Sequence, residues 1–148
     1  AGWWGHKESE RFQMKKGFIP EPGAAGWQLS NAPVLAMAAH KASLDMFDEV
    51  GMDALVAKGK QLNTFLEQVL MDAQAANDKI AFEIITPGER GCQISILTNE
   101  NGKALFDYLT ERDVVVDWRE PNVIRLAPVP MYNSFMDVWE FGELLKGF

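Results

Sequence analysis

The chain has 148 residues, a formal net charge of -7 and 47% hydrophobic residues, an ordinary composition for one globular domain with a sizeable core. No run of Lys and Arg accompanies this negative charge, which argues against nucleic acid as a partner. No apolar run approaches the roughly 20 residues of a membrane helix. The single cysteine, Cys92, excludes an internal disulfide, and His6 and His40 lie too far apart for metal-ligand spacing. We therefore expect a cytoplasmic protein with no metal site.

Residues 2 to 31 combine Trp, His, Gly and Pro without the hydrophobic period of either a helix or a strand. Long connections of this kind are uncommon in compact domains and are often functional when aromatic and polar groups are frequent in them. The stretch therefore predicts an ordered loop that contacts a ligand or another part of the protein.

Hydrophobic periodicity predicts the elements that follow the loop. In chain order they are helices over 34–50 and 52–76, strands over 80–86 and 92–97, a helix over 101–112, strands over 114–116 and 123–127, and a final helix from about 134. The first helix is apolar around much of its surface, so we expect it to be buried. The pattern indicates an α/β chain in which two long helices precede a small sheet braced by two more helices.

Arg125 is the strongest candidate for a functional residue. It lies between Ile124 and Leu126 in a short apolar strand, so its side chain points to the opposite face of the sheet. Its planar guanidinium suits a carboxylate ligand. The alternative is a salt bridge to one of the 21 acidic residues of the chain.

The loop offers three weaker candidates, each with a structural alternative. His6 could stack on or hydrogen-bond to a ligand ring, or it could brace the loop. Trp3 could offer its indole to an anion or an aromatic ring, or it could anchor the loop. Asn31 could donate its amide to a ligand, or it could cap the following helix. Cys92 lies in an apolar alternating pattern that favours an inert core thiol.

Seven blocks of sequence resemble the C-terminal third of the kynureninase family, and together they extend over essentially the whole chain. They are Gly2-Trp3-Trp4-Gly5-His6, Arg11-Phe12-Gln13-Met14, Gly26-Trp27-Gln28-Leu29-Ser30-Asn31-Ala32-Pro33, Ala42-Ser43-Leu44, Ile84-Ile85-Thr86-Pro87, Arg90-Gly91-Cys92-Gln93 and the run from Val123 to Phe135. Their order and the length of the last block make coincidence a poor explanation.

This resemblance implies the C-terminal domain of a fold-type-I enzyme that depends on pyridoxal phosphate, with a small and mostly antiparallel sheet. Residues 1–31 would be an active-site and interface segment at the end of the large domain, and residues 32–148 the small domain. The implied reaction is hydrolysis of L-kynurenine or 3-hydroxykynurenine to alanine and an anthranilate, in tryptophan catabolism or NAD biosynthesis. The family also implies a homodimer with shared active sites.

The resemblance assigns roles to five residues. Arg125 would bind the α-carboxylate of the substrate, while His6 and Ser30 would line the pocket for its aromatic ring. Trp3 and Asn31 would lie in the cofactor and substrate pocket. No lysine here matches the Schiff-base motif of the family, so the large domain would supply that lysine and we expect this chain alone to be inactive. Trp4, Trp27 and Ala32 depart conservatively from common family residues.

Two other functions remain open at this point. A cysteine desulfurase or selenocysteine lyase of the same fold would share the architecture but would need a cysteine on a mobile loop, which Cys92 does not match. An autonomous, non-catalytic ligand-binding module would instead be a compact monomer with no large exposed apolar surface.

Overall fold

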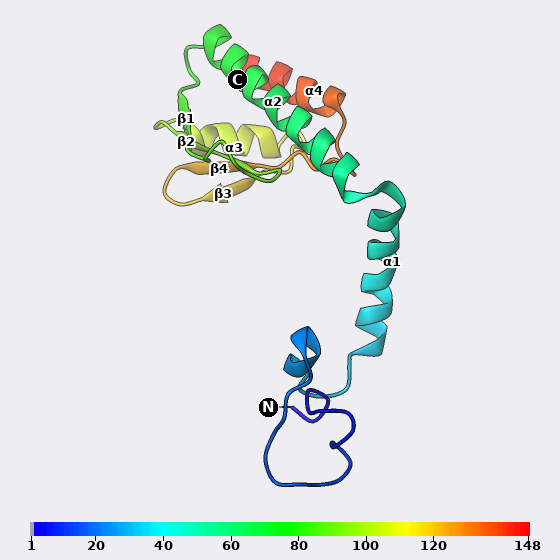
Figure 1. Cartoon of the computed structure of the whole chain (residues 1–148). Coiled ribbons are helices and arrows are strands. Elements are labelled where there is room, and N and C mark those ends of the chain that lie inside the picture. Colours follow the sequence, from blue (N-terminus) through cyan, green and yellow to red (C-terminus); the bar gives the residue numbers. More distant parts are fainter. Residues whose placement is uncertain (1) are drawn as a thin grey trace. The chain divides into compact units, whose positions relative to one another are not determined.

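The computed structural model describes residues 2–148 as two compact units. The first unit ends at Glu49 and the second runs from Val50 to Phe148. Figure 1 shows the helices and strands of each unit.

The first unit is an ordered loop followed by a helix. Backbone hydrogen bonds join the start of the loop to its later part, from Trp3 N to Leu29 O (3.1 Å) and from Lys7 N to Ile19 O (2.7 Å). Gly5 is buried where a Cβ atom would overlap the backbone at Gly26, so only glycine permits this close approach. The predicted loop is confirmed, except that residues Gly23–Trp27 form a short 3-10 helix, η1.

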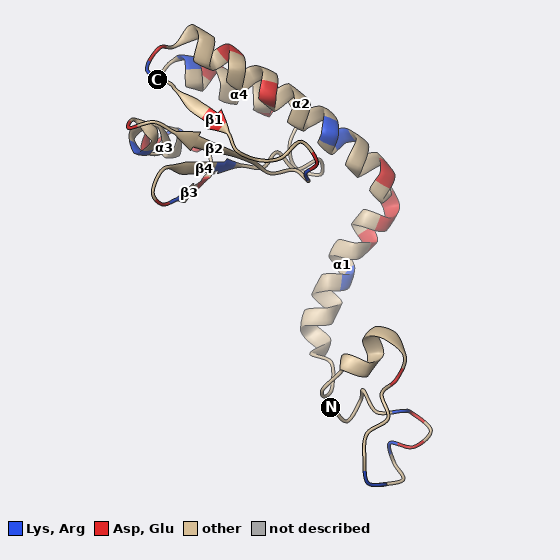
Figure 2. Cartoon of the chain, turned by 60° about the vertical axis from the view of Figure 1, so that its left-hand side comes forward, with Lys and Arg blue, Asp and Glu red and all other residues tan. Residues whose placement is uncertain are grey.

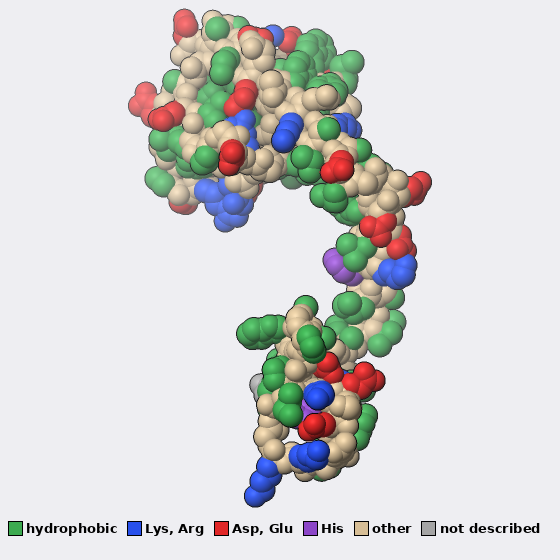
Figure 3. All heavy atoms as spheres, viewed as in Figure 1, with side chains coloured by type: hydrophobic (Ala, Val, Ile, Leu, Met, Phe, Trp, Pro, Cys, Tyr) green, Lys and Arg blue, Asp and Glu red, His purple; other side chains and the backbone are tan. Residues whose placement is uncertain are grey.

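Helix α1 (Val34–Val50) occurs where periodicity predicted it, but the expectation that it is buried is wrong. None of its residues is buried in the described part of the chain, and Leu35 is 88% exposed. Figure 3 shows hydrophobic side chains along this helix. Apolar periodicity predicts that a helix has a face to bury, but it does not identify what covers that face.

The second unit contains the sheet and the remaining helices. Its elements are α2 (Met52–Ala76), β1 (Phe82–Ile84), β2 (Ile94–Thr98), α3 (Gly102–Thr110), β3 (Asp117–Arg119), β4 (Val123–Leu126) and α4 (Phe135–Lys146). The strands form one antiparallel sheet in the order β1-β2-β4-β3. This arrangement confirms the predicted α/β class and the small antiparallel sheet.

The core lies between one face of the sheet and the helices. The register pairs Ile94 with Leu126 and Ile96 with Ile124, which places four buried side chains on the same face. Helices α2 and α4 pack together over this face (Figure 1), and α3 adds Leu105 to the same core. The opposite face carries the half-buried Arg125, which is paired in register with Ser95 and Asp117.

Helix α4 is fixed at its start and along its contact with α2. Ser134 and Asp137 form a capping box, in which each side chain accepts a hydrogen bond from the backbone N–H of the other residue. Farther along, Gly142 lies so close to Val69 of α2 that a Cβ atom would overlap the valine side chain.

The strand predicted over 114–116 is wrong, because β3 instead spans Asp117–Arg119. Antiparallel pairing with β4 sets this position by placing Asp117 opposite Arg125 and Arg119 opposite Val123. Val115 is 99% exposed and lies outside the ladder. Its β-branched side chain indicates a strand only when a partner strand lies beside it.

Candidate functional site

The five candidate residues lie on two different units. Trp3, His6, Ser30 and Asn31 belong to the loop of the first unit, and Arg125 belongs to β4 of the second.

His6 is held by its own loop. Its Nδ1 accepts a hydrogen bond from the backbone N–H of Ile19 (3.1 Å), and its ring lies against Phe18 with centroids 5.5 Å apart. An accepting Nδ1 in the neutral ring places the proton on Nε2. Among residues 2–148, no hydrogen-bond partner reaches Nε2, so this N–H can donate to a ligand while Nδ1 braces the loop.

Asn31 and Trp3 present N–H groups on the same unit. Asn31 Oδ1 accepts a hydrogen bond from Trp4 Nε1 (2.5 Å), so its amide NH2 group remains as a donor. Because Oδ1 accepts from Trp4, the Asn31 side-chain oxygen stabilises the loop and does not cap the following helix. Trp3 is 44% exposed and packs edge-on against Phe12, with centroids 5.7 Å apart. Ser30 is exposed beside Asn31.

Arg11 holds several parts of this loop together. Its side chain is only 10% exposed and donates to the backbone oxygen of His6 from Nε (3.3 Å) and Nη2 (3.1 Å). It also lies 4.9 Å from the centre of the Trp4 ring and pairs with Glu21. Arg11 thus connects His6 to Trp4, which in turn binds Asn31.

Arg125 forms an ion pair within the sheet. Its Nε donates to Asp117 Oδ2 (2.6 Å), and its Nη2 contacts the same oxygen. Arg119 Nε donates to this oxygen as well (3.0 Å). The hydrogen bond from Arg125, together with the charges of both arginines, lowers the pKa of Asp117 below its ordinary value of 3.8. The Arg125 side chain remains 33% exposed, so ligands can still reach it.

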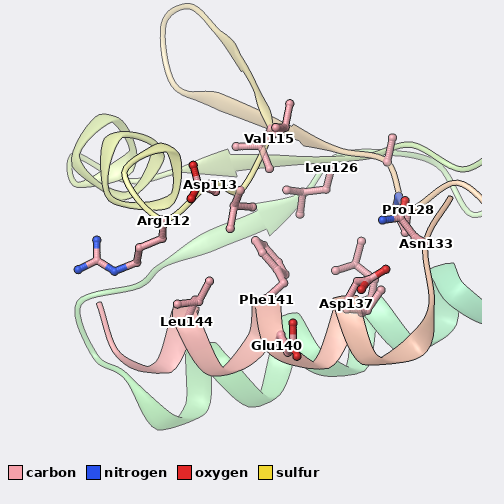
Figure 4. A pocket seen from close by; sticks show the side chains of 15 residues that line it. Arg112, Asp113, Val115, Leu126, Pro128, Asn133, Asp137, Glu140, Phe141 and Leu144 are labelled. Carbon is pink, nitrogen blue, oxygen red and sulfur yellow. The ribbon is translucent and has the colours of Figure 1, made fainter.

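A cavity of about 460 Å³ lies between α4 and the segments around β4. Figure 4 shows Phe141 pointing from α4 into this space, with Asp113 and Leu126 on the other side. Asp137 and Glu140 add negative charge to the wall. Arg125 is not part of the lining, because Leu126 beside it faces the opposite side of the sheet. No local sequence pattern indicates this cavity, because its walls come from segments far apart in the chain.

The segment before β2 is anchored to α2 by Arg90. This side chain pairs with Glu67 and donates to Asn63 Oδ1 (3.3 Å) and to the Pro87 backbone oxygen (3.2 Å). Cys92 follows it as a free, half-buried thiol. The segment is therefore tied to the helix by charged and polar contacts.

Residues 2–148 contain neither a helix that could span a membrane nor a cluster of metal ligands. No helix there is both long and apolar enough to cross a bilayer. No group of three or more His, Cys, Asp or Glu side chains is placed to hold a metal ion. Figure 2 shows the acidic and basic segments, with both signs of charge along α2 and in the sheet.

Comparison with known proteins gives one consistent family. Residues 55–145 match the kynureninase C-terminal domain. A kynureninase of Christiangramia forsetii is 54% identical over 98% of this chain, and one of Flavobacterium johnsoniae is 51% identical over 99%. A kynureninase of Xanthomonas euvesicatoria is 50% identical over 99%. The chain spans only 35% of the length of each of these relatives.

Proposed function

Because this chain belongs to the family of kynureninase C-terminal domains, we propose that it is part of a full-length kynureninase that depends on pyridoxal phosphate. The proposed reaction is hydrolysis of L-kynurenine or 3-hydroxykynurenine to L-alanine and the corresponding anthranilate. The observation that carries this proposal is identity of 54% and 51% to two kynureninases over 98% and 99% of this chain. The reaction would serve tryptophan catabolism or NAD biosynthesis.

Arg125 would bind the α-carboxylate of the substrate. Its guanidinium is partly exposed on the face of the sheet opposite the core, and Asp117 contacts only Nε and Nη2. The N–H groups of Nη1 therefore remain for a second carboxylate. Fixing this end of the substrate would orient its Cα for reaction.

The loop would contribute contacts to the cofactor and to the aromatic ring. Trp3 and Asn31 offer exposed, neutral N–H groups, a donor set that fits an anionic group such as the cofactor phosphate. When bound, pyridoxal phosphate supplies an electron sink for the bond cleavage. His6 and Ser30 would contact the substrate ring, with the Nε2 proton of His6 as a donor.

The rest of the site would come from outside this chain. The relatives are about three times as long, so we propose that their additional length includes the lysine that holds the cofactor. The 148-residue chain alone would then be inactive. We also propose a cytoplasmic homodimer with shared active sites. The apolar side chains exposed on α1 would be covered in that assembly.

Two other functions receive less support. A cysteine desulfurase would need a mobile catalytic thiol, whereas Cys92 is half-buried beside Gly59 of α2, close to the anchoring residue Arg90. A non-catalytic module would not account for the 54% identity to a kynureninase over 98% of this chain.

Product analysis of the full-length protein tests the proposal. Loaded with pyridoxal phosphate and given either kynurenine, the protein should release L-alanine and the matching anthranilate in equal amounts. Loading with the cofactor but no release of either anthranilate would reject the substrate assignment.

A further inference from the structure

Asp117 makes a contact with Arg125 that the proposed function does not use. One carboxylate oxygen, Oδ2, accepts from Nε (2.6 Å) and Nη2 of Arg125. The same oxygen accepts from Arg119 Nε (3.0 Å). The two residues face each other in the register of β3 and β4, so the sheet itself holds them together.

The edge of the Arg125 guanidinium that Asp117 contacts determines which N–H donors remain for a ligand. A guanidinium has about five N–H donors. Its side edge presents N–H groups of Nε and one Nη atom, and its end presents N–H groups of both Nη atoms. Asp117 takes the side edge of Arg125. Among residues 2–148, no hydrogen bond to Nη1 is formed, which leaves donors at the end of the guanidinium for another carboxylate.

Given the proposed function, on which this inference rests, we propose that Asp117 is a positioning residue for substrate binding. It holds Arg125 by the side edge and directs the end of the guanidinium toward the α-carboxylate of the amino-acid substrate. Arg119 shares the Asp117 oxygen, so the three side chains retain a formal charge of +1 that attracts this carboxylate. The lowered pKa of Asp117 keeps its carboxylate ionised at neutral pH.

A ligand pair that differs only at the carboxylate provides the test. L-Alanine, a product of the proposed reaction, and L-alaninamide would each be titrated as competitive ligands of the full-length holoenzyme. Loss of the charge-assisted contact should make the amide bind at least about tenfold more weakly to the unchanged enzyme. The ratio of the two inhibition constants measures recognition of the carboxylate alone.

Two variants and one control complete the design. Asp117→Ala should reduce the preference for L-alanine about tenfold, because Arg125 loses its fixed orientation. Asp117→Asn retains a neutral acceptor oxygen and should reduce the preference for L-alanine less than Asp117→Ala does. It takes the place of the alanine variant in the test if that variant fails to fold. The control is Asp107→Asn, which removes the same negative charge from the exposed ion pair of Asp107 with Lys103 on α3. This variant should leave the ratio of the two inhibition constants unchanged.

The outcomes separate the possible explanations. Equal weakening of both ligands, with an unchanged ratio, would mean that Asp117 only supports the fold. A stronger preference for L-alanine in the variants would mean that Asp117 competes with substrate. Either result would overturn the positioning role. If the unchanged enzyme neither cleaves kynurenine nor distinguishes the two ligands, the proposed function itself fails and this inference fails with it.

Discussion

Gly142→Ala tests the close contact between α4 and α2. Alanine gains about 1 kcal/mol over glycine from helix propensity. Its Cβ would overlap a Cγ of Val69, a stiff β-branched side chain that cannot rotate freely within a helix. Such overpacking costs about 1–3 kcal/mol, so the net change should be destabilising by about 1 kcal/mol. Urea unfolding of the 148-residue chain, followed by circular dichroism, measures this difference.

A double-mutant cycle with Val69→Ala identifies the cause. Val69→Ala alone should cost about 2 kcal/mol from lost burial and the cavity it leaves. In the double variant the new methyl group occupies that space, so the two changes should be coupled by about 2 kcal/mol in the favourable direction.

Gly59 of α2 is the matched control glycine. A Cβ at this position would meet the Cys92 sulfur at an ordinary 3.5 Å, so Gly59→Ala should stabilise the chain by up to about 1 kcal/mol. If Gly142→Ala is instead as stabilising as Gly59→Ala, and the cycle shows no coupling, the close packing of α4 on α2 is refuted.

Arg125→Ala in the full-length enzyme should lower kcat/KM by more than about a hundredfold, because a charge-assisted carboxylate contact is lost; an unchanged kcat/KM would remove Arg125 from the site. His6→Asn keeps an acceptor for Ile19 N–H but removes the ring, and should change the ratio of kcat/KM for the two kynurenines by about tenfold. An unaltered ratio would leave His6 only its role in bracing the loop. Ser134→Ala should destabilise the chain by about 1 kcal/mol in urea unfolding through loss of the cap, and no change would argue against the capping box. The backbone N–H of Ser134 lowers the pKa of Asp137 below its ordinary 3.8, so the ionised form stabilises the fold above that pH and loses this effect as the pH falls through the folded-state pKa. The stability difference between the unchanged chain and Asp137→Asn should therefore shrink below pH 3.8, and a difference independent of pH would contradict this.

Periodicity predicted the elements that pack against the core. The alternation of Ile94 and Ile96 placed β2 correctly because one face of that strand is buried. It failed for Val114 to Val116, since the position of β3 depends on pairing with β4 across a turn. Periodicity also predicted wrongly that α1 is buried, because an apolar helix face does not identify the part of the protein that covers it.

The candidate site could be predicted only residue by residue. Alternation around Arg125 correctly indicated a side chain on the face opposite the core. Its partner Asp117 was missed, because their contact depends on strand register. If an antiparallel turn at Glu120 to Asn122 had been recognised in the sequence, it would have placed the two residues opposite each other. The sequence did not indicate the role of Arg11, because loop arginines usually pair with acidic residues at the surface, whereas its side chain is only 10% exposed.

Anthranilate fluorescence tests whether the full-length protein cleaves kynurenine and whether the 148-residue chain can do so alone. The full-length protein and the 148-residue chain would each be incubated with pyridoxal phosphate and L-kynurenine or 3-hydroxykynurenine. We expect the full-length protein to produce the fluorescent anthranilate from at least one substrate and this chain alone to produce none. A full-length protein that takes up the cofactor but leaves both substrates intact would contradict the proposed function. Turnover by the 148-residue chain alone would contradict the proposal that the large domain supplies the cofactor lysine.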